Sequence, residues 1–125
     1  MSGAMTEDQT LLHVEAVARQ HLLDAGWTPT WPALATTMID TAIGEKQAIA
    51  RIEDWRSDRY VQDGFSISGE YWSEQGNVLA PHRVLLGPDP SEEQIAEGVS
   101  RFLRMANTAI DRCYARGLWL NGFGR

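Results

Sequence analysis

Apolar residues at the start of the chain recur at three- and four-residue steps, the spacing of one face of an α-helix. The members of this pattern are Leu11, Val14, Ala18, Leu22 and Ala25. Thr6 is a suitable N-terminal cap because acidic and amide residues follow it directly. Gly26 is a suitable C-terminal stop, since glycine adopts the left-handed backbone at low cost. The sequence therefore predicts a first helix from about residue 6 to residue 25.

Helical spacing continues from about Trp31 to Ser57 and predicts a second long or broken helix. The residues that keep this spacing are Leu34, Met38, Ala42, Ile49 and Ile52. Gly44 interrupts the pattern, and whether it breaks the helix stays open. The β-prone run Thr36–Ile39 does not fit a helix well.

The middle of the chain alternates apolar and polar residues around turn residues, as antiparallel strands do. Residues 59–62 and 65–72 flank Asp63-Gly64, a pair that accepts the positive φ angles of a tight hairpin turn. A further strand is expected over residues 78–86, where Pro81 indicates an edge strand or a bulge. Together these segments predict a three-stranded antiparallel meander over about residues 59–86.

A long C-terminal helix is expected between Asp89 and Gly117. Asp89 is the expected N-cap, with Pro90 in the first turn and Glu92 three residues after the cap. A wide apolar stripe follows, formed by Ile95, Val99, Phe102, Leu103, Ala106, Ile110 and Cys113. From residue 118 an apolar tail follows.

These elements predict an α+β fold in which three helices pack on one antiparallel sheet. Residues 1–5 are set apart as a tag or disordered start, and residues 6–125 are expected to form a single domain. A chain of 125 residues with 43% hydrophobic residues is long and apolar enough for one core.

Composition excludes several classes of function. The net charge of −6 disfavours binding to a nucleic-acid backbone and favours a basic partner. Cys113 is the only cysteine, which rules out an intramolecular disulfide and an all-cysteine zinc site. No apolar stretch is long enough to cross a membrane, and we expect a cytoplasmic protein.

Candidate chemistry is sparse. Glu70, Glu74 and His82 lie on adjoining predicted strands, where a carboxylate and an imidazole could meet, but a solvated sheet face is the simpler interpretation. His13 and His21 are two helical turns apart, too far for a shared metal. A helical row of arginines (Arg101, Arg104, Arg112 and Arg116) is likewise better interpreted as a solvated face than as a nucleic-acid site. We expect no catalytic residue, no metal and no cofactor.

Five tryptophans are many for so small a core, and some of them are expected to face a partner. Trp72 lies on the polar side of a predicted strand, while Trp119 and Phe123 lie in the apolar tail. The residues expected at a binding surface are therefore Trp72, Trp119, Phe123, Glu70 and Glu74.

The sequence favours a non-enzymatic protein-binding module. The chain has no catalytic motif, an acidic composition and aromatic residues at expected surface boundaries. This profile is shared by small acidic inhibitors, immunity proteins and phage-type accessory proteins. One alternative is an enzyme or small-ligand binder with a cleft lined by Glu70, His82 and Trp72; a second is a nucleic-acid binder that uses the arginine row. A homodimer is expected because a three-stranded meander leaves open edges, which like edges or exchanged tails would cover.

Overall fold

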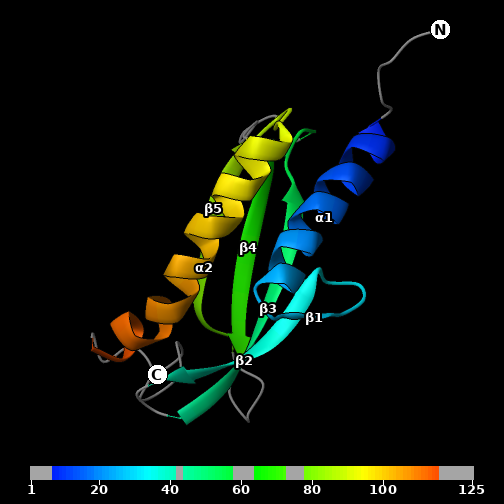
Figure 1. Ribbon diagram of the computed structural model, residues 1–125. Helices are drawn as coiled ribbons and strands as arrows, with labels where there is room; N and C mark the ends of the chain where they lie inside the picture. The colour runs from blue at the N-terminus through cyan, green and yellow to red at the C-terminus, as the bar shows by residue number, and fades with distance from the viewer. Residues whose placement is uncertain (1–6, 42–43, 58–63, 73–77, 116–125) are drawn as a thin grey trace, which may run out of the picture.

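The chain forms an α+β fold of two helices and one antiparallel sheet (Figure 1). The structure is a computed structural model and describes residues 7–41, 44–57, 64–72 and 78–115. The elements in chain order are α1 (Glu7–Asp24), β1 (Thr28–Pro29), β2 (Ala35–Thr41), β3 (Gly44–Asp54), β4 (Phe65–Trp72), β5 (Val78–Gly87) and α2 (Glu92–Ala115).

The sheet has five strands in the order β1-β2-β3-β4-β5, each antiparallel to the next. The expected second helix is therefore wrong, because residues 35–41 and 44–54 form β2 and β3. In β3 the buried residues Ala48 and Ala50 alternate with the half-buried Ile49. Pairing of β3 with strands on both sides outweighs the helical spacing, since tertiary contacts commonly override local preference. The three-stranded meander accordingly becomes a five-stranded one.

The hairpin prediction is confirmed only in part. β4 pairs with β5 as expected, but its other partner is β3, with Asp54 opposite Phe65. The expected strand over residues 59–62 lies outside the described residues. Gly64 has the positive φ expected of a turn glycine, 79°. A Cβ on Gly64 would overlap the backbone of Gly87 and Pro88, so the close approach of these two segments requires glycine.

Pro81 lies in an edge strand, as predicted. β5 is the last strand of the sheet, and the β4–β5 register shifts between Gly69 and Tyr71. Gly69 pairs with His82 and Tyr71 with Leu79, so β5 carries one extra residue at this bulge. A residue without a backbone N–H fits this position because a bulge interrupts the ladder.

Local backbone hydrogen bonds set the helix ends. At the end of α1, Trp27 N–H donates to Leu22 O and Gly26 N–H donates to Leu23 O, both at 3.0 Å. Gly26 has a φ of 96°, and this combination is a Schellman motif. The predicted end of the first helix is confirmed, whereas Thr6 lies outside the described residues.

The N-terminal cap of α2 is Ser91 and not Asp89, so the helix begins at Glu92. Ser91 Oγ accepts from Gln94 N–H at 3.1 Å, and Gln94 Oε1 accepts from Ser91 N–H at 2.8 Å. This reciprocal pair is a capping box. It satisfies the backbone N–H groups of Ser91 and Gln94, which a cap at Asp89 would leave to solvent. The predicted stop, Gly117, lies outside the described residues.

Both helices pack on the same face of the sheet, which we call the covered face (Figure 1). Alternate strand residues point toward the helices and form the core with one side of each helix. The largest fully buried side chains are Tyr71, Phe65, Phe102, Leu22, Leu34, Ile67 and Ile95. The other face, called the open face, carries the alternate strand residues, among them Met38 and Leu85 at 52% and 54% exposure.

Gly64→Ala should lower the free energy of unfolding by about 2 kcal/mol or more, because a positive φ and a backbone overlap act together. Gly87→Ala is the matched control: its φ is 94°, but no atom lies within 4 Å of a Cβ there. It should cost only about 1 kcal/mol. Urea unfolding of both variants measures the difference. Equal losses of unfolding free energy in the two variants would show that Gly64 does not closely approach the backbone of Pro88.

Candidate protein-binding groove

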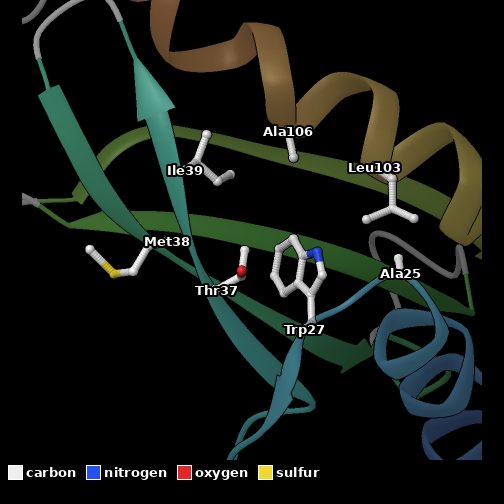
Figure 2. Close-up of a pocket in the computed structure, with 7 residues that line it drawn as sticks. All are labelled: Ala25, Trp27, Thr37, Met38, Ile39, Leu103 and Ala106. Atoms are coloured by element: carbon white, nitrogen blue, oxygen red, sulfur yellow. The ribbon is translucent and has the colours of Figure 1, made fainter.

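A groove of about 450 Å³ opens on the covered side of the sheet, between the end of α1, the edge of β2 and α2. It is lined by Ala25, Trp27, Thr37, Met38, Ile39, Leu103 and Ala106. In Figure 2 the Trp27 ring stands between β2 and α2, whereas Met38 points away from it toward the other side of the strand. None of the described lining side chains is acidic or basic, and all of them except Thr37 are apolar or aromatic, so this part of the groove is suited to apolar groups.

Trp27 forms the floor of the groove and is held there by the end of α1. The Schellman motif places Trp27 directly after Gly26, which turns the chain back toward the sheet. The indole is 8% exposed and lies 5.9 Å from the Phe102 ring, tilted by 56°. Because α1, β2 and α2 all contribute to its surroundings, the floor is fixed by the core.

The edge of β2 beside the groove is largely unpaired by the described strands. β1 pairs with β2 only at Thr36 and Ala35, through Thr28 and Pro29. From Thr37 to Thr41 the ladder assigns β2 a partner on the β3 side alone. Every second residue of such a segment directs its backbone N–H and C=O outward. An open strand edge and an apolar groove thus lie side by side.

Glu70 is a described member of the binding surface expected from sequence. It lies on the open face, where its carboxylate is 3.4 Å from Arg51 Nε. The remaining expected residues are outside the described side chains: Trp72 is placed in β4 by its backbone only, and Glu74, Trp119 and Phe123 are not described. Among the arginines of the expected row, Arg101 and Arg104 are exposed on α2.

The imidazole of His82 lies on the covered face, opposite to Glu70. It shares a hydrogen bond of 2.9 Å with the Tyr71 hydroxyl and stacks on the Phe102 ring at a centroid distance of 4.7 Å. Both Glu70 and His82 border a shallow depression of about 330 Å³. Strand alternation nevertheless points their side chains to opposite sides of the sheet, so carboxylate and imidazole do not form a pair.

Sequence reasoning missed Trp27 and the groove around it. An apolar residue directly after a helix-stopping glycine commonly packs back onto the last turn, and this signal at Gly26-Trp27 could have identified a buried indole. One wall of the groove is formed by β2, whose residues the sequence pattern predicts as part of a helix. The groove could not be predicted without that strand.

Within the described residues, no group of three or more His, Cys, Asp or Glu side chains is placed to hold a metal ion. Neither described helix combines the length and the hydropathy needed to cross a bilayer. No family model, curated protein or solved structure matches the chain. The groove and the open face must therefore be interpreted from their own geometry.

Burial raises the pKa of the Tyr71 phenol above its ordinary value, because the ionised form would lose its hydration. Above about pH 10 the unfolded chain can release this proton while the folded protein cannot. The contribution of Tyr71 to the free energy of unfolding should therefore be constant below about pH 9 and fall above about pH 10. Below about pH 9, Tyr71→Phe should lower the free energy of unfolding by a constant amount, from the lost hydrogen bond to His82, and above about pH 10 it should remove this part of the slope. Urea unfolding between about pH 8 and pH 11 tests this, and parallel curves for both proteins would contradict it.

Proposed function

We propose that the protein is a non-enzymatic protein-binding module that takes an extended segment of a partner along the free edge of β2. The observation that carries this proposal is the coincidence of two features: a strand edge over Thr37–Thr41 to which no described strand is paired, and the Trp27 groove beside it. In recognition by strand addition, backbone hydrogen bonds supply affinity and a neighbouring pocket supplies specificity.

The geometry defines the kind of segment that fits. A strand added beside β2 alternates its side chains between the groove and the side of Met38. Residues that face the groove meet Trp27, Leu103 and Ala106 and should be apolar. Residues between them face solvent near the open face, where the net charge of −6 favours lysine or arginine. The expected motif alternates apolar and basic or neutral residues over about five positions, the length of the free edge.

Binding without chemistry is supported by the composition of the groove. Its described lining side chains, among which Thr37 carries the one hydroxyl, supply no general base and no cation, which acyl or phosphoryl transfer would need. The sheet also separates His82 from Glu70, the acid–base pair considered in the alternative function. A nucleic-acid function has no comparable support, since none of the residues described in the groove lining is basic.

A random linear peptide library displayed on phage and selected against the full-length protein should yield peptides with this alternation. Ala25→Trp should weaken their binding at least tenfold, because Ala25 is exposed and a large ring there fills the mouth of the groove. Leu12→Trp is the matched control, since Leu12 is 60% exposed on α1, the helix that Ala25 directly follows, but is not among the lining residues of the groove. Fluorescence anisotropy of labelled peptides measures both affinities.

Hydrogen exchange provides a second readout of the same proposal. A bound peptide should slow exchange of backbone amides within Thr37–Thr41, because added hydrogen bonds must break before exchange. Failure to enrich any peptide, equal binding by Ala25→Trp and Leu12→Trp, or unchanged exchange in β2 would each contradict strand addition at this edge.

A further inference from the structure

The open face of the sheet carries a diagonal row of uncharged residues. Met38, Ile49, Ser68 and Leu85 come from β2, β3, β4 and β5 in turn. From one member of the row to the next, the position moves to the neighbouring strand and two residues along the strand direction. The strand register shows this through the pairs Met38↔Gln47, Ile49↔Glu70, Arg51↔Ser68 and Ser66↔Leu85. Its ends are apolar and exposed, at 52% for Met38 and 54% for Leu85. We call these four residues the diagonal row.

Charged residues of opposite sign flank the diagonal row. Arg51 and Glu70 lie on opposite sides of its centre and form an ion pair of 3.4 Å. Nearer to Leu85, Glu53 lies on the side of Arg51 and Arg83 on the side of Glu70. These four charges sum to zero, although the whole chain carries −6. The part of the face around the row's centre and its Leu85 end can therefore meet a second copy without net repulsion, whereas Glu45 lies further out, beyond Met38.

The flanking charges are held on this face by contacts with neighbouring side chains. Glu53 Oε1 accepts from the buried Ser66 hydroxyl at 3.3 Å, and Ser66 Oγ accepts from Trp55 Nε1–H at 3.2 Å. The Arg83 guanidinium lies 5.6 Å from the centre of the Trp55 ring. Trp55 thus links an acid and a base that lie on opposite sides of the diagonal row.

We infer that the open face is a self-complementary interface, and that two copies of the chain pack face to face about a two-fold axis along the diagonal row. Strands lie about 4.8 Å apart and residues rise about 3.3 Å along a strand, which fixes the positions on the face. Rotation about the row lays Met38, Ile49 and Leu85 against their own counterparts. The same rotation exchanges the two flanks, so Arg51 meets Glu70 of the partner subunit and Arg83 meets Glu53 of the partner subunit.

This arrangement matches known packing of sheets and of symmetric dimers. The row makes an angle of about 35° with the strands, so strands of the two copies cross at about 70°, close to the orthogonal class of sheet packing. A two-fold contact uses the same patch on both copies, and opposite charges across it fix the orientation. The dimer differs from one formed by strand edges, because the contact uses the face of the sheet. The inference does not rest on the proposed groove, which opens on the other side of the sheet, although Met38 borders both surfaces.

Complementation between two charge-reversed variants tests the interface directly. In the dimer, position 51 of each subunit lies opposite position 70 of the other. Arg51→Glu alone places two acids at both of these contacts, and Glu70→Arg alone places two bases there, so each variant should be monomeric. An equimolar mixture of the two variants should dimerise. In the mixed dimer one subunit has glutamate at positions 51 and 70 and the other has arginine at both, so every contact joins opposite charges. Light scattering at high micromolar protein measures mass, and thermal melts confirm that both variants fold. The intramolecular ion pair is lost in both, so it cannot explain recovery in the mixture.

Leu12→Glu is the control, since Leu12 is as exposed as Leu85 but lies on α1; it should remain dimeric. A chain ending at Gly117 should also remain dimeric. The inference is overturned if the unmodified protein is monomeric at high micromolar concentration, if either charge reversal leaves the dimer intact, or if the mixture stays monomeric. A dimer lost only on truncation would assign the contact to the tail.

Discussion

Burial of a single face of the sheet is the constraint on which the rest of the structure depends. Each strand sends alternate side chains to opposite faces, and both helices pack on one of them. Small residues at the centre of β3, Ala48 and Ala50, are fully buried there, and the large ring of Tyr71 lies beside Ala48. Phe102 of α2 packs onto this layer and also contacts Trp27 and His82. One aromatic side chain thus joins the helix, the sheet and the end of α1.

One-sided burial leaves two different surfaces available for contacts. On the covered side, β1 is too short to pair with all of β2, and the remaining edge borders the Trp27 groove. On the open side, the strand register aligns uncharged residues between balanced charges. The proposed uses of these surfaces are compatible, because a dimer through the open face would leave a groove free on each copy.

Local signals in the sequence predicted the parts of the fold that depend on local physics. Gly26 ended α1 as expected, and the alternation from Phe65 to Tyr71 was correctly assigned to a strand. β2 and β3 were missed because their apolar residues also fit helical spacing, and because alanines such as Ala48 and Ala50 indicate helix when read alone. What makes them strands is pairing with each other and with β4, which is not local.

The candidate surfaces were harder to predict than the fold. Charge balance beside the diagonal row depends on the register of four strands, and a shift of one residue would send these side chains to the other face. The cap of α2 was a different kind of error, since the Ser91-x-x-Gln94 pattern was present in the sequence and Asp89 was preferred. The missed groove and row therefore reflect missing tertiary information, whereas the missed cap does not.

Hydroxyl-radical footprinting at two protein concentrations would test the central claim most directly, that one face is covered by helices and the other by a second copy. In dilute protein Met38 and Leu85 should be labelled strongly, while the buried Phe65 and Tyr71 are protected. At high micromolar concentration Met38 and Leu85 should become protected together, and the exposed Leu12 should be labelled as before. Labelling of Met38 and Leu85 that does not change with concentration would contradict the account.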